Sequence, residues 1–437
     1  MNLPKLLRDI WFVDAEVLTR NGLKKLNFKV SDGIVAEISV GKPDVSPEKI
    51  YSIAGMTVFP AFTDMHVHFR EPGFAYKETI HTGSLAAAAG GFSTVCTMPN
   101  LNPAPDTVEN LNLQLDIIKK DAVIDVIPFA TITKKRMGHE LVDFDSMAPF
   151  VAGFSDDGSG VQDESVMREA MKMIAKTGKI LAAHCEVNSL LKGGYIHDGE
   201  YARQNNHKGI CSESEWKEVE RDIRLAEETG CRLHVCHIST KESVRLIRDA
   251  KKRGIQVTCE TGPHYLTFCD KNLREHGRFK MNPPIRGEED REALREGLAD
   301  GTIDVVATDH APHSESEKSK GLEKSAMGVV GLETAFPAVY TTMVASGLMP
   351  LERLIDAMII RPRNILGLPE YHGIETGMRA DITIVDLNAE THVDPSLFKT
   401  MGRSTPYDGE TLKGKINLTL FKGAPVFEAK NLLFCNK

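Results

Sequence analysis

The stretch ILAAH at residues 180–184 shows the unit from which the middle of this chain is built. It is a short apolar run that ends on a histidine. Residues 213–228, further along, carry apolar side chains every three or four positions among charged ones, which is typical of a helix that packs one face inward. A short apolar strand, a loop and a helix in alternation predict a parallel sheet covered by helices.

The same unit recurs along the chain. We count eight strands, which end within TVFPAFTDMHVH (57–68), TVCTM (94–98), VIPFA (126–130), FVAGF (150–154), ILAAH (180–184), LHVCH (233–237), VTCE (257–260) and DVVATD (304–309). Eight strand-helix units predict an α/β protein with a closed (β/α)8 barrel of the TIM type.

The two ends of the chain have a different texture. Alternating segments such as KLNFKV (25–30), ITIVD (382–386) and INLTLF (416–421) are separated by turn residues, which is typical of β hairpins. We therefore expect residues 1–57 and 375–437 to form one small β-sandwich domain, and residues 58–374 to form the barrel.

Composition excludes several classes of function. The chain has 437 residues and a formal net charge of -8, so it has no general attraction to nucleic acid or to an anionic membrane. No run reaches the roughly 18 apolar residues of a membrane span, and the first residues do not form a signal peptide. The eight cysteines form no CxxC pair. These features predict a cytoplasmic protein with reduced thiols.

Metal-binding residue types stand at the carboxyl ends of five of the expected strands. A single histidine at a strand end is more often a packing residue than a ligand, but a barrel of this type builds its active site at this end. Four imidazoles and the carboxylates suit two ions roughly 3.5–4 Å apart, and zinc fits them best, although manganese or cobalt could bind the same groups. The residues are His66 and His68, Asp156 and Asp157, His184, His237 and Asp309.

Such a pair of ions predicts hydrolytic chemistry. Two cations on one water lower its pKa toward neutrality and supply a hydroxide nucleophile. They also polarise a carbonyl oxygen, so the site suits the opening or closing of an amide bond. Asp309 is placed to bind one metal, to accept the proton and to pass it to the leaving nitrogen as general base and then general acid.

An ordered set of motifs resembles the dihydroorotases of the amidohydrolase superfamily. The resemblance runs from about residue 55 to residue 390 and is carried by HVHFREPG (66–73), MPN (98–100), FSDDG (154–158), AHCE (183–186), HIST (237–240), NPPIR (282–286) and ATDHAPH (307–313). It implies a barrel with a flanking β domain, two zinc ions per subunit, and the reversible cyclisation of N-carbamoyl-L-aspartate to L-dihydroorotate in pyrimidine biosynthesis.

The resemblance also implies a role for each predicted ligand. His66 and His68 resemble ligands of the first metal, and His184 and His237 resemble ligands of the second. Asp309 resembles the catalytic acid and base, and a further metal ligand. Many relatives bridge their metals with a carboxylated lysine, which this chain lacks. Asp157 is the expected bridge, as in the bacterial subgroup that uses aspartate, and Asp156 is its rival.

The substrate contacts follow the same resemblance. Arg70 can hold a carboxylate through two parallel charged hydrogen bonds, although a surface ion pair is the simpler alternative. The other expected contacts are His68, Asn100, Asn282, His313 and the backbone of Met327 and Gly328. Met327 departs from the phenylalanine that is usual in the family. The polar loop 314–326 is expected to be either a solvated connection or a lid.

Other functions share parts of this motif pattern. A hydantoinase-like or allantoinase-like cyclic amidase shares the barrel, but its lysine bridge is absent here. A non-catalytic partner of aspartate carbamoyltransferase is expected to lack the ligands that this chain keeps. A nucleobase deaminase is suggested by HCE (184–186), but its PCxxC partner is missing. The family implies a homodimer, with association with aspartate carbamoyltransferase as a further possibility.

Overall fold

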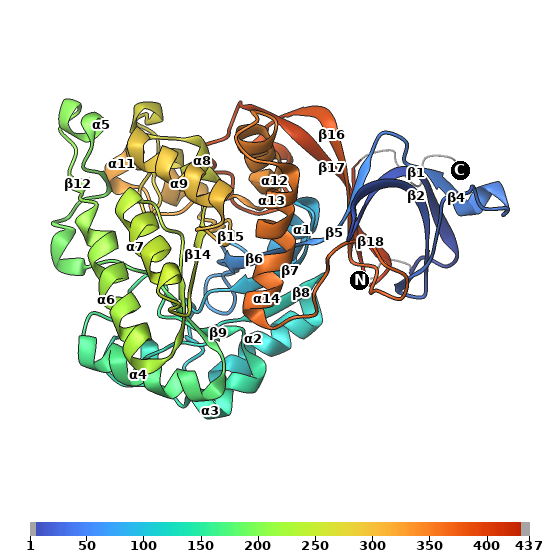
Figure 1. The fold of residues 1–437 in the computed structure, drawn as a ribbon. Helices are drawn as coiled ribbons and strands as arrows, with labels where there is room; N and C mark the ends of the chain where they lie inside the picture. Colours follow the sequence, from blue (N-terminus) through green and yellow to red (C-terminus); the bar gives the residue numbers. More distant parts are fainter. Residues whose placement is uncertain (1–5, 430–437) are drawn as a thin grey trace.

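The computed structural model describes residues 6–429, and the middle of this range is a closed barrel (Figure 1). The described barrel strands pair in parallel as two sheets, β6-β7-β8 and β9-β10-β13-β14-β15. Parallel bridges from Ala130 to Phe154 and from Val67 to His310 join the sheets into a ring. The strands are β6 (Phe62–Val67), β7 (Phe92–Thr97), β8 (Asp125–Pro128), β9 (Gly153–Phe154), β10 (Ile180–Ala183), β13 (Arg232–Val235), β14 (Val257–Thr261) and β15 (Val305–Val306).

Helices alternate with these strands and cover the barrel. They bury apolar faces because their apolar residues recur at helical spacing, as Met167, Met171 and Ile174 do in α4. The predicted (β/α)8 barrel is therefore confirmed. The larger covering helices are α1 (Ile80–Ala89), α2 (Val108–Asp121), α4 (Glu164–Thr177), α6 (Glu213–Thr229), α7 (Lys241–Lys252), α9 (Glu288–Asp300) and, after β15, the shorter α12 (Ala335–Val339), α13 (Leu351–Ile355) and α14 (Arg361–Leu366).

Shorter elements lie in the loops. The described short helices are α3 (Phe144–Met147), α5 (Glu200–Gln204), α8 (Pro263–Thr267), α10 (Glu315–Lys318) and α11 (Gly321–Lys324). Two short strands, β11 (Ile196–His197) and β12 (Gly209–Ile210), pair outside the barrel.

Strands from both ends of the chain form a second unit beside the barrel (Figure 1). Its sheet has the order β18-β17-β16-β5-β1-β2-β3, with β4 paired to β1, as expected for one β domain built from both termini. β5 lies across the predicted boundary between residues 57 and 58. The strands are β1 (Ile10–Thr19), β2 (Gly22–Ser31), β3 (Ile34–Ser39), β4 (Ile50–Ser52), β5 (Thr57–Pro60), β16 (Ile382–His392), β17 (Thr411–Phe421) and β18 (Ala424–Glu428).

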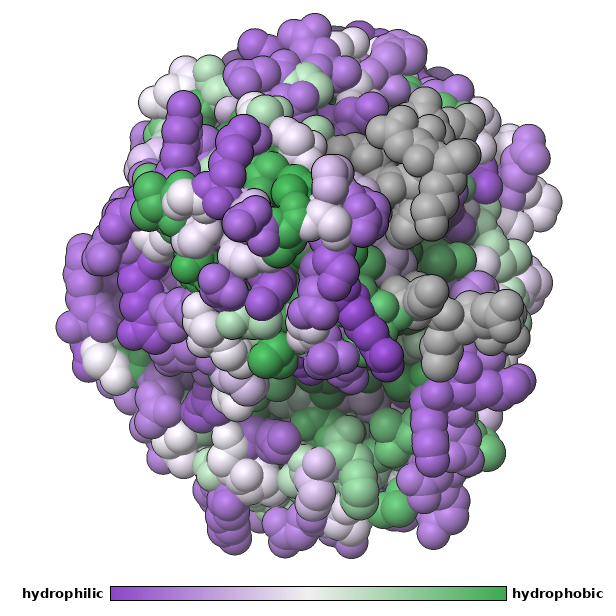
Figure 2. Space-filling view, turned by 90° about the vertical axis from the view of Figure 1, so that its right-hand side faces the viewer, coloured by the Kyte–Doolittle hydropathy of each residue, from purple (hydrophilic) through white to green (hydrophobic). Residues whose placement is uncertain are grey.

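The β domain has its own apolar interior. Phe12 and Phe28 are fully buried there, with ring centroids 5.0 Å apart. Hydrophilic residues cover most of the outer face on this side of the molecule, with smaller hydrophobic areas between them (Figure 2).

Two further expectations concern the whole chain. No helix among residues 6–429 combines the length and apolar character needed to cross a membrane. The seven cysteines within that range are free thiols, and Cys435 lies outside the described residues.

Candidate metal centre and active site

The six predicted metal ligands meet at one end of the barrel. His66 lies in β6, and His68 follows the end of that strand. The other four side chains follow the carboxyl ends of β9, β10, β13 and β15, and each of the six residues is less than 7% exposed. Strand ends from distant parts of the sequence meet here because a parallel barrel gathers them at one face. The four residues are Asp157, His184, His237 and Asp309.

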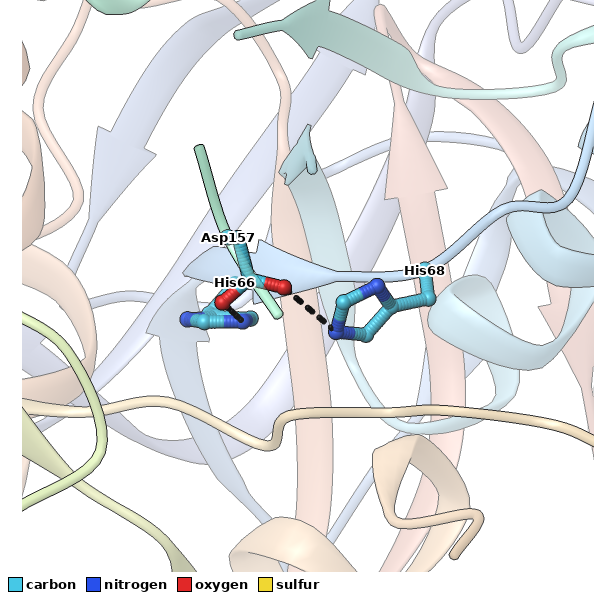
Figure 3. A group of neighbouring side chains, drawn as sticks. All are labelled: His66, His68 and Asp157. Atoms are coloured by element: carbon cyan, nitrogen blue, oxygen red, sulfur yellow. Dashed lines mark ion pairs between the residues drawn. The ribbon is translucent and has the colours of Figure 1, made fainter. Parts of the chain in front are cut away.

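Asp157 lies at the centre of this group. Its Oδ1 is 3.5 Å from His66 Nε2, 3.6 Å from His184 Nδ1 and 3.6 Å from His237 Nε2. Its Oδ2 is 3.6 Å from His68 Nε2. Figure 3 shows His66 and His68 on either side of the Asp157 carboxylate. One carboxylate therefore faces all four imidazoles.

The neighbouring Asp156 points elsewhere. Its Oδ1 accepts hydrogen bonds from the backbone N–H groups of Ile132 and Thr133, at 2.8 and 3.1 Å. Its Oδ2 accepts from the Thr133 hydroxyl. Asp156 thus fixes the loop after β8, whereas Asp157 faces the imidazoles.

Asp309 approaches the group from the end of β15, which is bridged to β6. Its Oδ1 lies 2.9 Å from His68 Nε2 and 3.5 Å from His66 Nε2. Burial raises the pKa of Asp309, but the hydrogen bond with His68 and the charges of His66 and His237 outweigh it and lower the pKa to about 2. Asp309 is therefore a carboxylate at neutral pH. Its φ of 46° is left-handed, a backbone conformation that Asp and Asn tolerate better than most residues.

The donor atoms fit divalent cations. Two groups of ligand atoms, each within 4.8 Å of one another, share Asp157. Among the described residues, His66 Nε2 and Asp157 Oδ1 are buried without a hydrogen-bond partner, which is costly unless another species binds them. Imidazole nitrogen with carboxylate oxygen is a common ligand set for zinc. The buried residues are thus consistent with a binuclear metal site. The two groups are His66, His68 and Asp157, and Asp157, His184 and His237.

Two of the predicted ligands have close partners on their outer nitrogens. His66 Nδ1 is 2.7 Å from Glu260 Oε1, and His68 Nδ1 is 2.8 Å from Asn100 Oδ1. Sequence reasoning assigned Asn100 to the substrate and gave Glu260 no role. Its position at the end of the apolar strand VTCE (257–260) is the sequence feature that points to Glu260.

Arg70 lies beside the same centre and is only 8% exposed. Its Nε donates to the Pro312 carbonyl at 3.3 Å, and within residues 6–429 no carboxylate forms an ion pair with it inside 4.0 Å. Burial lowers its pKa to about 10, although Asp309 and Asp157 oppose this shift. The alternative of a surface ion pair is therefore wrong.

Asn282 and His313 hold defined orientations. Asn282 Nδ2 donates to Glu186 Oε1 at 2.9 Å, and no residue in the described part of the chain hydrogen-bonds to its buried Oδ1. His313 Nε2 lies 2.8 Å from the Met327 carbonyl, and Lys77 Nζ lies 3.2 Å from its Nδ1. Asn282 therefore keeps a free acceptor, whereas both ring nitrogens of His313 are engaged.

Gly328 forms a close backbone approach next to His313. Its φ is 131°, and a Cβ there would lie 2.8 Å from the Ala311 carbonyl oxygen. Its N–H donates to the Lys280 carbonyl at 3.1 Å. Only glycine fits this position without strain, so the backbone at 327–328 is held by its surroundings.

The loop 314–326 is anchored by a few buried residues, although several of its other residues are exposed. Leu322 is fully buried, and the buried Lys318 donates through Nζ to the carbonyls of Lys280 and Ala326 at 2.9 and 2.8 Å. Glu317 forms an ion pair with Lys77 at 2.9 Å. These contacts attach the loop to the segments that carry Lys77 and Lys280. Closure of this loop as a lid stays a prediction.

Comparisons with known proteins place this site in a family. Residues 55–243 match the family model described as Dihydro-orotase-like. The chain is 48% identical over 411 residues to a dihydroorotase of Fusobacterium nucleatum, covering 94% of this chain and 96% of that protein. It is 45% identical over 421 residues to a dihydroorotase of Bacillus subtilis, covering 95% and 98%. The chain belongs to the dihydroorotase family.

Solved structures agree with this fold. The L-hydantoinase of Arthrobacter aurescens superposes with a TM-score of 0.84 at 27% identity and covers 97% of this dihydroorotase-family chain and 96% of its own. A D-hydantoinase superposes equally well, at 19% identity. The hydantoinase structures share the barrel and the β domain, whereas the near-full-length sequence relatives above are dihydroorotases.

Proposed function

We propose that this protein is a dihydroorotase, a cyclic amide hydrolase that interconverts N-carbamoyl-L-aspartate and L-dihydroorotate. The proposal is supported by similarity to dihydroorotases over nearly the whole chain and by a buried centre of imidazoles and carboxylates.

The environment of Arg70 indicates the class of substrate. A buried guanidinium without a carboxylate partner is costly, and its planar fork matches a carboxylate. Both proposed substrates carry a carboxylate, whereas hydantoin and allantoin carry none. The Arg70 site therefore favours dihydroorotate over a plain cyclic amide.

We assign two zinc ions to the centre. His66, His68 and Asp309 would hold the first, His184 and His237 would hold the second, and Asp157 would bridge them. When bound, the ions supply Lewis acidity that activates water and a carbonyl group near neutral pH. Asp157 suits a bridge because its carboxylate lies within 3.6 Å of imidazoles from both sets, such as His68 and His237.

Asp309 is the proposed acid and base. Asp309 is a carboxylate at neutral pH, so one of its oxygens can accept a proton and then return it to the leaving nitrogen. The 2.9 Å between Oδ1 and His68 Nε2 places Asp309 beside the predicted ligands of the first ion.

The remaining residues would orient the substrate. Asn282 presents its free Oδ1 as an acceptor for a substrate N–H, because Glu186 occupies its amide nitrogen. His68, Asn100 and His313 would surround the carboxylate held by Arg70. The backbone of residues 327–328 would contact the ring. Met327 in place of the usual phenylalanine changes only the side chain there.

Several finer assignments belong to the same proposal. We propose residues 58–374 as the catalytic barrel, residues 1–57 with 375–437 as the β domain, a cytoplasmic location and a homodimer. We also propose association with aspartate carbamoyltransferase. Size-exclusion chromatography with light scattering, alone and with that enzyme, tests both assemblies.

Substrate choice tests the proposed activity. Purified protein loaded with zinc is incubated with L-dihydroorotate, hydantoin and allantoin, and ring opening is followed by ultraviolet absorbance. We expect the highest kcat/KM on dihydroorotate. In Arg70→Lys, which keeps the charge but loses the fork, the KM for dihydroorotate should rise more than the KM for any hydantoin turnover. A preference of the unmodified protein for hydantoin or allantoin would overturn the assignment.

A further inference from the structure

We propose that Glu260 is a positioning residue that orients His66 and supports His237, and thereby sets the affinity of the metal centre. The proposal deepens the proposed function because it concerns the same metal site. It rests on the geometry of a buried carboxylate that the ligand assignment does not use.

Glu260 lies within β14, between the strands that carry the other ligands, and its side chain is fully buried. Its Oε1 is 2.7 Å from His66 Nδ1. The opposite ring nitrogen, His66 Nε2, faces Asp157. Glu260 therefore holds His66 from behind while the front of the ring faces the centre.

This arrangement has a clear chemical consequence. An imidazole that gives Nε2 to a metal carries its hydrogen on Nδ1, and an acceptor at Nδ1 fixes both the tautomer and the ring rotation. A carboxylate acceptor also makes the ring a stronger ligand. His66 should thus be oriented before a metal arrives.

Glu260 also supports the backbone of His237. The His237 N–H approaches Glu260 Oε1 at 3.4 Å, and the Ile238 N–H donates to the Glu260 carbonyl at 2.9 Å. His237 has a φ of 32°, which costs energy in a residue other than glycine and persists only when its surroundings hold it. One glutamate therefore contacts a predicted ligand from each metal position.

The second oxygen of Glu260 is fixed as well. Oε2 lies 3.1 Å from His234 Nε2, and His234 Nδ1 lies 2.8 Å from the Thr258 hydroxyl. His234 thus restricts rotation of the carboxylate. The outer nitrogen of His184, in contrast, is 3.7 Å from Glu186, which is beyond a normal hydrogen bond.

Metal affinity tests the proposal without any substrate. Zinc is titrated against a competing chelator for the wild type, Glu260→Gln and Glu260→Asp, and cobalt is substituted to read ligand geometry from the visible spectrum. Loss of such an outer carboxylate typically weakens metal binding 10–100-fold. We expect a loss of this size in Glu260→Gln, a smaller one in Glu260→Asp, and an altered cobalt spectrum in both.

Glu215→Gln is the matched control. Glu215 is also buried and accepts hydrogen bonds from the backbone of Ser239 and Thr240, both at 3.0 Å, but it contacts none of the predicted ligands. Both glutamine variants should lower thermal stability, but only Glu260→Gln should lower metal affinity. If Glu260→Gln does not fold, the smaller shift in Glu260→Asp carries the test.

The outcomes separate this inference from the proposed activity. Unchanged affinity in the Glu260 variants, or an equal loss in Glu215→Gln, overturns the role of Glu260. Weaker binding in the Glu260 variants of a protein that turns over no dihydroorotate supports the role of Glu260 and overturns the activity instead. A wild-type protein that binds no zinc overturns the metal centre and this inference together.

Discussion

Side chains at the mouth of the barrel are buried as deeply as those inside the β domain, but their burial has the opposite effect on stability. Phe12 and Phe28 are fully buried and stack on each other. His66 is buried to the same degree, and Asp157 is 2% exposed. Burial of apolar rings stabilises the fold, whereas burial of polar atoms without partners destabilises it by about 1–3 kcal/mol each.

The difference shows that the β domain is built for stability and the barrel mouth for binding. The β domain places apolar residues from both termini in one core. The barrel mouth keeps unpartnered atoms on His66 and Asp157 and left-handed backbone at His237 and Asp309. Such strain is typical of functional sites held by rigid surroundings. The following experiments test whether function and stability divide along this line.

The largest expected effect is on activity at the mouth. Asp309→Asn should lower kcat by about 10²–10⁴, because an amide cannot accept the proton. Asparagine tolerates the left-handed φ of 46° at this position, so the fold should remain intact. Steady-state kinetics, circular dichroism and zinc content after gel filtration provide the measurements. Full activity in Asp309→Asn would show that another residue moves the proton.

The β domain should give the reverse result. Phe28→Ala removes a fully buried ring that stacks on Phe12, and such a change typically costs about 3–5 kcal/mol of stability. Urea denaturation followed by circular dichroism measures this loss. The kcat per folded molecule should stay near the wild-type value, since this ring lies in the other domain. A large fall in kcat without loss of stability would contradict the division.

A smaller effect is expected where the chain after β16 returns to the barrel. Glu333 Oε1 accepts hydrogen bonds from the N–H groups of Lys399 and Thr400 at 2.7 and 3.2 Å. Burial raises the pKa of Glu333 from 4.5 to about 7, although these hydrogen bonds oppose the shift. The native state therefore keeps a proton between pH 4.5 and 7 that the unfolded chain has lost.

The sign of the pH effect follows from this difference in bound protons. The contribution of Glu333 to stability is largest below pH 4.5 and is lost as the pH rises through 7. Relative to Glu333→Gln, the wild type should lose about 1–3 kcal/mol between pH 4.5 and 8, measured by urea denaturation across that range. A constant difference between the two proteins would mean that Glu333 titrates normally.

The barrel and most of its site were predictable from the sequence, for a local reason. Each strand-helix unit carries its own pattern, and all strand ends of a parallel barrel meet at one face. His66 and His184 could therefore be placed together although 118 residues separate their positions in the chain. The pairing of strands from both termini in one sheet could also be predicted, because both ends alternate apolar and polar residues.

Other features depended on contacts that no local pattern contains. The sequence left Asp156 and Asp157 as rivals, and their orientations differ because the N–H groups of Ile132 and Thr133 hold Asp156. It gave no role to Glu260, whose importance depends on the distance to His66 across the barrel. It could not tell how the loop 314–326 is anchored, since Lys318 is held by the Lys280 carbonyl from another segment and by the Ala326 carbonyl at the end of the loop.

The sequence by itself thus determined the kind of fold, the residue types at each strand end and the chemistry that they favour. Tertiary structure alone decided which carboxylate faces the imidazoles, which guanidinium lacks an ionic partner, and which buried glutamate orients a ligand. The physical reason is the sequence separation of the interacting residues. Periodicity and strand ends are set by neighbours in the chain. Side-chain orientation at a site is set by partners that only the closed barrel brings within hydrogen-bonding distance.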